Sequence, residues 1–247
     1  MNTQTRRVSA PLARCSYETQ IGNPRGDGRR GGDALLHALA GASHDNVTAA
    51  AQARSFASTL AHHQARFPRP GVLLDRDGTI IVDYGYVGSV HQVNFIDGAA
   101  EAIAELNQAD VPVALVTNQS GVARGLYSTG DVKLVHQHIA EYLQDRGAHI
   151  DLYLYCPFHP DGIVDAFARP SDDRKPRPGM AHAAADALNL DLANSWVVGD
   201  RPEDVGLAEA VGASAIYLGP DDCTRPGVWH FPSLAASVSF ILERIAV

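Results

Sequence analysis

The stretch Gly71-Val-Leu-Leu-Asp-Arg-Asp-Gly-Thr79 decides the fold of this 247-residue chain. Its first four residues form a short, continuous apolar run, which is typical of a strand buried in a parallel sheet. Residues two apart in a strand point the same way, so Asp75 and Asp77 are expected to project together from its end. Two carboxylates at close range repel each other unless a cation lies between them. The two aspartates therefore predict a hard metal ion such as Mg²⁺, although an isolated Asp-x-Asp segment more often caps a turn.

The rest of the chain alternates between short apolar runs and segments with helical spacing. Further buried strands are expected at residues 111–116, 151–155, 195–198 and 213–218. Helices are expected at residues 97–106, 128–146, 178–188, 202–211 and 233–245. This alternation predicts an α/β fold in which a parallel sheet lies between two layers of helices. Ligands of such sheets bind beyond the carboxyl ends of the strands, so the chemistry is expected there.

Polar residues follow the second predicted strand and precede the helix at residue 178. The segment Thr117-Asn-Gln-Ser120 offers side chains that can hydrogen-bond a phosphoryl oxygen. Lys175 is a compact positive charge that could neutralise a phosphoryl group and a neighbouring carboxylate. Arg174 offers a planar fork for bidentate contacts. These residues indicate a place for a phosphate group.

The fourth predicted strand is followed by Asp200, Glu203 and Asp204. Asp200 is placed to complete a magnesium site with Asp75, because Mg²⁺ takes a few oxygens from the protein and the rest from water and phosphate. Each signal alone is more typical of a turn, a basic loop or a helix cap. Together they supply the nucleophile, donor, cation and metal ligand that phosphoryl transfer requires. We therefore expect a magnesium-dependent phosphatase whose nucleophile is Asp75.

Composition limits the other function classes. The net charge is −8, and residues 71–247 hold eleven basic and twenty-four acidic residues, which argues against a nucleic-acid partner. No apolar run approaches the ~18 residues of a membrane span, and no secretory signal is visible. Three scattered cysteines make a poor disulfide framework. We expect a cytoplasmic monomer or weak homo-oligomer that acts on a small phosphorylated molecule, with no membrane and no nucleic acid as partner.

Residues 1–70 are expected to form an N-terminal extension, and residues 71–247 the phosphatase domain. Residues 1–32 are rich in Gly, Arg, Ser and Pro and lack an apolar period, which is typical of disorder. Residues 33–65 are Ala-rich and predict one or two peripheral helices. Pro68 and Pro70 favour a linker between the two parts.

Four segments resemble the four motifs of the haloacid dehalogenase (HAD) superfamily. They are Leu74-Asp-Arg-Asp-Gly-Thr79, Val116-Thr-Asn-Gln-Ser120, Arg174-Lys-Pro-Arg-Pro-Gly179, and Val198-Gly-Asp200 with Asp204. Within the superfamily the chain is similar to D,D-heptose 1,7-bisphosphate phosphatases and the related histidinol-phosphate phosphatases. The runs Asp83-Tyr-Gly-Tyr-Val87 and Tyr155-Cys-Pro-Phe-His-Pro160 are close to the heptose enzymes. The similarity covers about residues 71–218 and implies a Rossmann-like HAD fold.

The resemblance also implies roles for individual residues. Asp75 would attack phosphorus and form an aspartyl-phosphate, and Asp77 would protonate the leaving oxygen and then activate water. Thr117 and Lys175 would stabilise the phosphoryl group. The implied Mg²⁺ ligands are the Asp75 side chain, the Asp77 backbone carbonyl and Asp200, with Asp204 in a supporting shell. The implied substrate contacts are Asp83, Tyr84, Gly85, Tyr86, Asn118, Gln119, Ser120, Arg124, Arg174 and Arg201.

One loop departs from the family's pattern. The heptose enzymes usually bind a structural Zn²⁺ through Cys-x-His and Cys-x-Cys before the Arg-Lys-Pro motif. Here the loop keeps Cys156, but Phe158 stands at the His position, and Ser171 and Asp173 stand where the later cysteines would be. One soft ligand out of four is not a zinc site, so structural Zn²⁺ is not expected. We expect packing to hold the loop instead, with Phe158 and Phe167 buried.

Too few residues lie between the motifs for a large cap domain, so an open site is expected. The 7-phosphate of D-glycero-D-manno-heptose 1,7-bisphosphate is the expected point of hydrolysis. Histidinol phosphate, or another long-chain sugar (bis)phosphate of secondary metabolism, is an alternative that keeps the chemistry. A catalytically degenerate binding module is the non-enzymatic alternative, and the presence of every residue assigned to catalysis disfavours it.

Overall fold

A six-stranded parallel sheet forms the centre of the molecule. The computed structural model describes residues 67–218 and 226–245. Its strands are β1 (Val72–Leu74), β2 (Val113–Asn118), β3 (Leu152–Cys156), β4 (Trp196–Gly199), β5 (Ser214–Tyr217) and β6 (Val228–His230). They lie in the order β3-β2-β1-β4-β5-β6, and every neighbouring pair is parallel. β1 therefore lies inside the sheet, between β2 and β4, as its continuous apolar run predicts.

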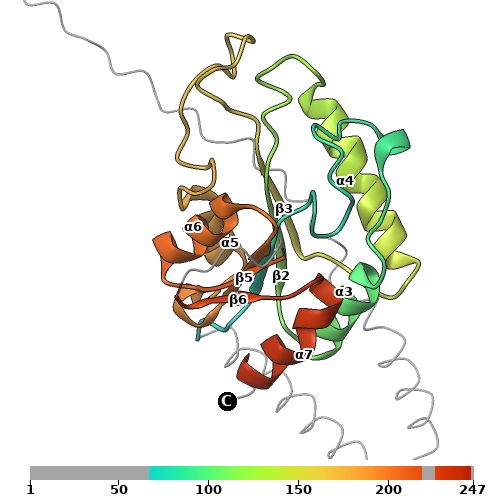
Figure 1. Cartoon of the computed structure of the whole chain (residues 1–247), viewed down its shortest axis with the longest axis vertical. Helices are drawn as coiled ribbons and strands as arrows, with labels where there is room; N and C mark the ends of the chain where they lie inside the picture. Colours follow the sequence, from blue (N-terminus) through green and yellow to red (C-terminus); the bar gives the residue numbers. More distant parts are fainter. Residues whose placement is uncertain (1–66, 219–225, 246–247) are drawn as a thin grey trace, which may run out of the picture.

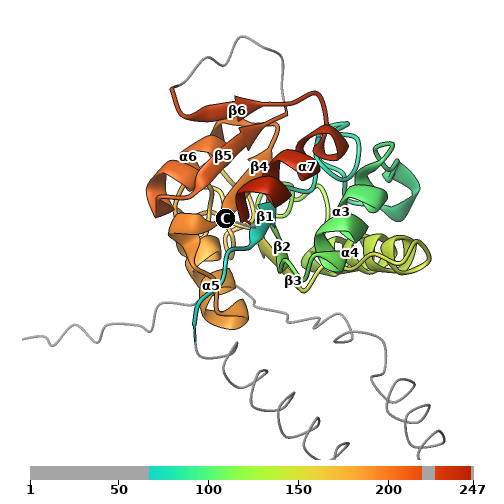
Figure 2. The ribbon, with the colours of Figure 1, turned by 90° about the horizontal axis from the view of Figure 1, so that it is seen from below.

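Helices cover both faces of this sheet (Figures 1 and 2). Those that the structure describes are α3 (Ala99–Gln108), α4 (Thr129–Gln144), α5 (Gly179–Leu188), α6 (Pro202–Val211), α7 (Leu234–Ile245) and the short 3₁₀ helices η1 (Val90–Gln92) and η2 (Leu192–Asn194). α5 and α6 lie on one face, and α3, α4 and α7 on the other. The predicted α/β fold is confirmed. None of the described helices is long and apolar enough to cross a membrane.

The alternating side chains of β1 explain why both faces need a cover. Val72 and Leu74 belong to the hydrophobic cluster under α3, α4 and α7, which also contains Ile103. Leu73 points to the opposite face and joins the cluster under α5 and α6, which contains Met180. All five side chains are at most 1% exposed. Because burying one large aliphatic side chain stabilises a fold by about 2 kcal/mol, the strand that carries Asp75 is firmly fixed.

Local signals in the sequence begin the helices that frame the site. Ser128 Oγ accepts a hydrogen bond from the backbone N–H of Asp131, and the Asp131 carboxylate accepts one from the backbone N–H of Ser128. This capping box begins α4. Pro202 begins α6, where its fixed φ angle suits the first helical turn. The Asp204 carboxylate accepts a hydrogen bond from the backbone N–H of Arg201, which ties the start of α6 to the site.

Two differences from the sequence prediction affect the sheet. β2 extends to Asn118 instead of residue 116, so Thr117 and Asn118 are part of the strand itself. β6 was not predicted, because a three-residue edge strand has no buried run to mark it. Its central residue, Trp229, is 42% exposed. Neither difference moves the carboxyl edge where the chemistry was expected.

The expected linker packs against the domain at its last residues. Arg69 Nη1 donates hydrogen bonds to the backbone carbonyl and to the carboxylate of Asp110, both at 2.9 Å. The backbone N–H of Arg69 donates to the carbonyl of Asn189. The remainder of the predicted extension, residues 1–66, lies outside the described residues.

The carboxyl edge of the sheet carries no large cap domain within the described part of the chain. The segment between β1 and α3 contains η1 and loops, and the segment between β2 and α4 is a loop. The longest irregular segment runs from β3 to α5. Figure 1 shows these three segments on the same side of the sheet, so they form the surroundings of an open site.

Candidate active site

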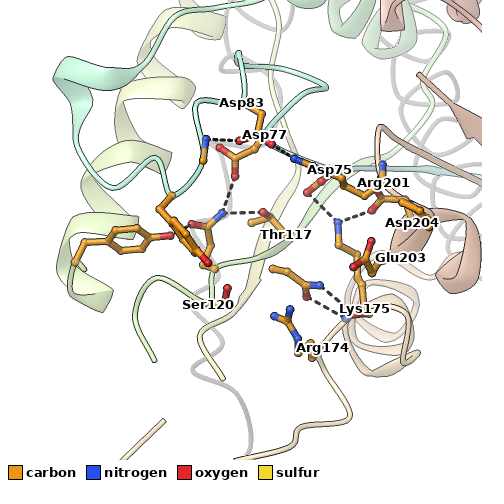
Figure 3. A pocket seen from close by; sticks show the side chains of 16 residues that line it. Asp75, Asp77, Asp83, Thr117, Ser120, Arg174, Lys175, Arg201, Glu203 and Asp204 are labelled. Carbon is orange, nitrogen blue, oxygen red and sulfur yellow. Dashed lines mark hydrogen bonds and ion pairs between the residues drawn. The ribbon is translucent and has the colours of Figure 1, made fainter. Parts of the chain in front are cut away.

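The carboxyl ends of β1, β2 and β4 meet at a cavity of about 600 Å³ that is lined mostly by polar residues (Figure 3). Its lining brings together residues from segments far apart in the sequence, and most of the predicted site residues are among them. The lining residues are Asp75, Asp77, Asp83, Gly85, Tyr86, Thr117, Asn118, Gln119, Ser120, Tyr127, Arg174, Lys175, Arg201, Pro202, Glu203 and Asp204. Three predicted residues are not part of this lining: Tyr84, Arg124 and Asp200.

Lys175 joins two of the carboxylates at this edge. Its Nζ lies 2.8 Å from Asp75 Oδ1 and 2.6 Å from Asp204 Oδ1, and the side chain is 2% exposed. Burial opposes the positive charge, but the carboxylates of Asp204 and Asp75 outweigh it and raise the pKa of Lys175. Lys175 therefore stays charged. Asp75 Oδ1 also accepts the backbone N–H of Arg76 at 2.8 Å, so both contacts fall on the same carboxylate oxygen.

Among the described residues, three carboxylates form a group that can hold a metal ion, called the acid cluster below. Oxygens of Asp75, Asp200 and Asp204 all lie within 4.8 Å of one another. Asp200 packs directly over Gly78, where an added Cβ would lie 2.2 Å from the Asp200 carboxyl carbon. Burial and the nearby charge of Asp75 raise the pKa of Asp200 to about 6. Asp200 Oδ1 is buried and has no hydrogen-bond partner among the described residues. Crowded oxygen ligands and an unpartnered carboxylate oxygen fit a hard cation such as Mg²⁺.

Asp204 has a second set of bonds that distinguishes it from Asp200. It is 1% exposed, and its two oxygens are engaged by the Lys175 ammonium and by the backbone N–H of Arg201. Burial raises the pKa of Asp204, and Lys175 opposes that shift. This arrangement is compatible with the supporting position predicted for Asp204, beside a metal that is bound by its neighbours.

Asp77 leaves β1 beside Asp75 and is held by its own set of donors. Arg76 Nε and Nη2 donate to the two Asp77 oxygens at 3.1 and 3.0 Å, and Gln119 Nε2 donates to Oδ2 at 2.9 Å. Burial raises the pKa of Asp77; Arg76 opposes this, and Asp75 adds to it. A carboxyl group with a raised pKa is suited to give and take a proton near neutral pH.

Thr117 and Asn118 occupy the end of β2. Thr117 is 1% exposed, and its Oγ1 accepts a hydrogen bond from Gln119 Nε2 at 2.9 Å. The Asn118 side chain binds the backbone of Lys175 on both sides: Nδ2 donates to the Lys175 carbonyl, and Oδ1 accepts from its N–H, both at 3.0 Å. Asn118, predicted as a substrate contact, thus positions the lysine through its amide.

Asp83 and Arg201 face each other across the cavity mouth. They form an ion pair, and the Asp83 carboxylate also accepts the backbone N–H of Gly85 at 2.7 Å. Although burial opposes ionisation, the Gly85 hydrogen bond and Arg201 lower the pKa of Asp83. Arg201 Nε lies 3.6 Å from Asp200 Oδ2, so the same guanidinium reaches the acid cluster.

Tyr84 and Arg124 lie outside the cavity lining. The Tyr84 side chain is 61% exposed, and its hydroxyl accepts a hydrogen bond from Asn94 at 3.3 Å. The Arg124 guanidinium lies 6.0 Å from the centroid of the Tyr86 ring, and its Nη2 lies 3.4 Å from His159 Nε2. Both residues therefore remain predictions as substrate contacts.

Arg174 and Ser120 line another part of the cavity (Figure 3). Nη1 of Arg174 is buried without a hydrogen-bond partner among the described residues, and the guanidinium forms no ion pair within that part of the chain. Arg201 and Lys175, by contrast, are both paired with carboxylates. Arg174 is thus the cation of this lining whose charge is least compensated.

Three lining residues were not predicted as site residues: Tyr127, Pro202 and Glu203. Pro202 and Glu203 open α6 directly after Arg201, and their position after a strand-end motif was the available signal. Tyr127 lies in the loop before α4 and has no motif to mark it. Burial raises the pKa of Tyr127 to about 12, so its hydroxyl remains a hydrogen-bond donor.

Packing and cation–π contacts hold the loop between β3 and α5. Phe158 is 6% exposed, and its ring centroid lies 5.8 Å from that of the half-buried Phe167. The Arg169 guanidinium lies 4.1 Å from the Phe158 ring centroid. The carbonyl of Ala123 accepts the backbone N–H groups of residues 163 and 164, at 2.8 and 3.0 Å. The predicted burial is thus complete for Phe158 and partial for Phe167.

Ser171 and Asp173, which stand where the heptose enzymes usually have zinc-binding cysteines, hydrogen-bond to each other. Ser171 Oγ lies 3.4 Å from Asp173 Oδ2 and accepts the backbone N–H of Asp173 at 3.2 Å. Cys156 is fully buried, and its Sγ lies 3.9 Å from the Phe158 carbonyl. Among the described residues, the group that could hold a metal ion is the acid cluster at Asp75, which does not include this loop.

Comparison with known proteins finds a matching family model and similar phosphatases. A family model described as HAD-hydrolase-like matches residues 173–225. The D-glycero-beta-D-manno-heptose-1,7-bisphosphate 7-phosphatase of Escherichia coli O6:H1 (strain CFT073) is 38% identical over 177 residues, which cover 72% of this chain and 90% of that protein. The protein of the same name from Yersinia pestis is 42% identical over 172 residues, which cover 67% and 92%.

A similar fold is found among solved structures. The D,D-heptose 1,7-bisphosphate phosphatase from B. bronchiseptica, complexed with magnesium and phosphate, matches with a TM-score of 0.64. The two sequences are 32% identical, and the match covers 70% of this chain and 98% of the other. That protein holds magnesium and phosphate on the fold that here carries the acid cluster and Lys175.

Proposed function

The chain belongs to the HAD-like phosphatases, the family that includes the D-glycero-beta-D-manno-heptose-1,7-bisphosphate 7-phosphatases, and from this we propose that it hydrolyses the 7-phosphate of such a heptose bisphosphate. It is a hydrolase of phosphoric monoesters. The observation that carries the proposal is the Lys175 ammonium, which lies between Asp75 and Asp204 beside the Asp200 carboxylate. This contact supports a site in which a nucleophile, a cation and a metal-binding group lie together, as phosphoryl transfer requires.

We propose the following steps for the chain's own residues. Asp75 attacks phosphorus and forms an aspartyl-phosphate as the bond to the sugar oxygen breaks. Asp77 gives that oxygen a proton, then takes one from the water that hydrolyses the intermediate and releases phosphate. Lys175 and Thr117 lie where they can stabilise the phosphoryl oxygens. Mg²⁺, held by Asp75, Asp200 and the Asp77 carbonyl, would add positive charge against those oxygens.

The cavity supports a substrate that carries a second anion. Arg174 lines it together with Lys175, and its guanidinium has a buried nitrogen without a partner among the described residues. Because Lys175 is already bound by two carboxylates, Arg174 is the cation available for a phosphate remote from the reacting one. An extended sugar bisphosphate fits a cavity that is lined mostly by polar residues and that no large cap domain covers within the described part of the chain.

We also propose that the loop between β3 and α5 needs no zinc. The contacts of Phe158 with Phe167 and Arg169 supply a hydrophobic and cation–π anchor at the position where a metal would otherwise tie the loop. The hydrogen bonds between Ser171 and Asp173 support this interpretation, because they satisfy polar groups with each other.

A substrate panel tests the proposed function. The full chain is incubated with MgCl₂ and with a D-glycero-D-manno-heptose 1,7-bisphosphate, the two heptose monophosphates, or histidinol phosphate, and phosphate release is measured. We expect kcat/KM for the bisphosphate to exceed that for each monophosphate by about 10-fold or more, since one charge-assisted contact is worth that much. The product should keep its 1-phosphate, as read by phosphorus NMR. Equal rates on all substrates reject the substrate assignment, and no release from any ester rejects the phosphatase.

A further inference from the structure

Gln119 links Asp77, the proposed proton donor to the leaving oxygen, with Thr117, which is proposed to stabilise the phosphoryl oxygens. Its Nε2 donates hydrogen bonds to Asp77 Oδ2 and to Thr117 Oγ1, both at 2.9 Å. Its Oε1 accepts from Arg76 Nη2 at 3.0 Å and from the Tyr127 hydroxyl at 2.7 Å. Gln119 is 1% exposed. The amide is thus fully used inside the protein, although the resemblance implied a substrate contact.

The donors around Oε1 fix the direction of the amide. A Gln side chain could rotate by half a turn and exchange its oxygen and nitrogen, but a guanidinium and a hydroxyl then face an NH₂ group. Arg76 is fully buried and donates as well to Asp77 and to the carbonyl of Val87. Tyr127 therefore supplies the second donor that turns the NH₂ group toward Asp77.

The Tyr127 ring is held in a slot made by two glycines. A Cβ added at Gly88 would lie 2.1 Å from a ring carbon, and one added at Gly121 would lie 2.3 Å from another. No side chain fits at either position without moving the ring. The hydroxyl is consequently kept at Gln119, and its raised pKa keeps it protonated.

We propose that Gln119 and Tyr127 are positioning residues for catalysis: Tyr127 fixes the Gln119 amide, and Gln119 holds the Asp77 carboxyl group in register with Thr117. This inference rests on the proposed role of Asp77 in the phosphatase reaction. A carboxyl group that protonates a leaving oxygen must keep one direction relative to the phosphoryl group, and small displacements of such a group reduce the rate strongly. The network supplies that direction before any substrate binds.

A leaving-group series separates positioning from a general structural role. Proton donation matters for an alkyl leaving group and hardly for p-nitrophenolate, which leaves without a proton. In Tyr127→Phe and Gln119→Met we expect kcat/KM for a sugar or alkyl phosphate to fall about 10-fold and about 100-fold, within the range for a general acid. For p-nitrophenyl phosphate kcat/KM should change less than about 2-fold. A plot of kcat/KM against leaving-group pKa should therefore become steeper.

Matched variants keep the test decisive. Tyr153→Phe removes another buried tyrosine hydroxyl, on β3, and should leave the plot unchanged. Because Tyr127 acts through Gln119, Tyr127→Phe should have no further effect in a Gln119→Met background. An equal fall on every leaving group, or additive losses in the double variant, overturns the proposal. Should wild type fail to cleave any of the esters, the proposed phosphatase activity itself is rejected, and that outcome is recognised before any variant is made.

Discussion

Lys175 Nζ lies 2.8 Å from Asp75 Oδ1, so the proposed nucleophile is already ion-paired in the folded chain. The Asp75 side chain is 9% exposed, so the Lys175 ammonium supplies the countercharge that a buried carboxylate needs. The ammonium contacts one carboxylate oxygen and leaves the other for the proposed attack. The same pair ties the end of β1 to the segment that precedes α5.

Asp75→Asn should abolish turnover and preserve the fold. The amide has almost the same shape as the carboxylate but is a poor nucleophile, so we expect kcat to fall by at least about 10³-fold. Lys175 keeps its bond to Asp204 in the variant. Phosphate release and the circular dichroism spectrum check the prediction. Residual turnover above that level would assign the attack to another group.

Lys175→Met should destabilise the folded state. Removal of the ammonium leaves two buried acids, Asp75 and Asp204, without a countercharge, and breaking a buried ion pair in this way typically costs about 3–5 kcal/mol. Divalent cations should restore part of that loss, because they bind beside the same carboxylates. Urea unfolding with and without MgCl₂ measures both effects. Unchanged stability in the absence of metal would contradict the prediction.

Arg174→Ala should weaken recognition of the remote phosphate. We expect KM for a heptose bisphosphate to rise about 10-fold or more, with a smaller change for a monophosphate, since the lost contact is charge-assisted. Arg177→Ala is the matched control: it lies in the same loop, is 54% exposed and pairs with Asp172 at the surface. Its KM values should stay near wild type. A similar rise in both variants would indicate a general charge effect.

Stability should decrease as the pH falls below the ordinary pKa of histidine, because of His136. This residue of α4 is buried, with the Tyr153 and Tyr155 rings 5.4 and 5.8 Å away, and burial lowers its pKa well below 6.5. Below pH 6.5 the unfolded chain binds a proton on His136, whereas the folded chain does not. The contribution of the neutral, buried His136 to the free energy of unfolding is therefore complete above that pH and is lost progressively below it.

The variant His136→Leu isolates this effect. Between pH 7.5 and 5.5 the wild type should lose about 1 kcal/mol more than the variant, the value for one group whose proton uptake occurs in the unfolded state alone. Urea unfolding curves at the two pH values provide the comparison. An identical pH dependence in both proteins would show that His136 is protonated in the fold.

Phe158→Ala should loosen the loop between β3 and α5. Truncation of a buried Phe side chain costs about 3 kcal/mol, and the Arg169 contact is lost with it. Ile163→Ala, at a loop position that is 79% exposed, should change stability by less than about 0.5 kcal/mol. A zinc chelator should leave the thermal midpoint of the wild type unchanged. A lower midpoint after chelation would reveal a structural metal.

The strand ends could be predicted because their signals are local. The apolar run before Asp75 marks β1, and the rule that ligands bind beyond the carboxyl ends of parallel strands predicts that Asp75 and Asp200 lie at one edge of the sheet. The edge strand β6 was missed because three half-exposed residues have no buried pattern. The spacing of apolar residues thus predicted whether a segment is a helix or a strand wherever that segment packs against the core.

The partners of individual side chains could not be predicted in the same way. Gln119 and Asn118 stand in a motif expected to bind substrate, yet their amides bind Asp77 and Lys175. Tyr127 enters the site because two glycines leave room for its ring, and no spacing rule reports that. Such contacts depend on how loops from different strands fold against one another, which residue order alone does not specify.

Asp75, the proposed nucleophile, and Asp200, a proposed metal ligand, directly follow buried strands, whereas Arg174 and Asp83 stand on irregular segments beside them. Packing of the core constrains the residues that follow the strands, whereas residues on the irregular segments can be substituted one at a time. Such an arrangement allows the substrate preference to change while the proposed chemistry is kept. Residues 83–87 and 157–174 are accordingly the places where directed evolution toward another ester should begin.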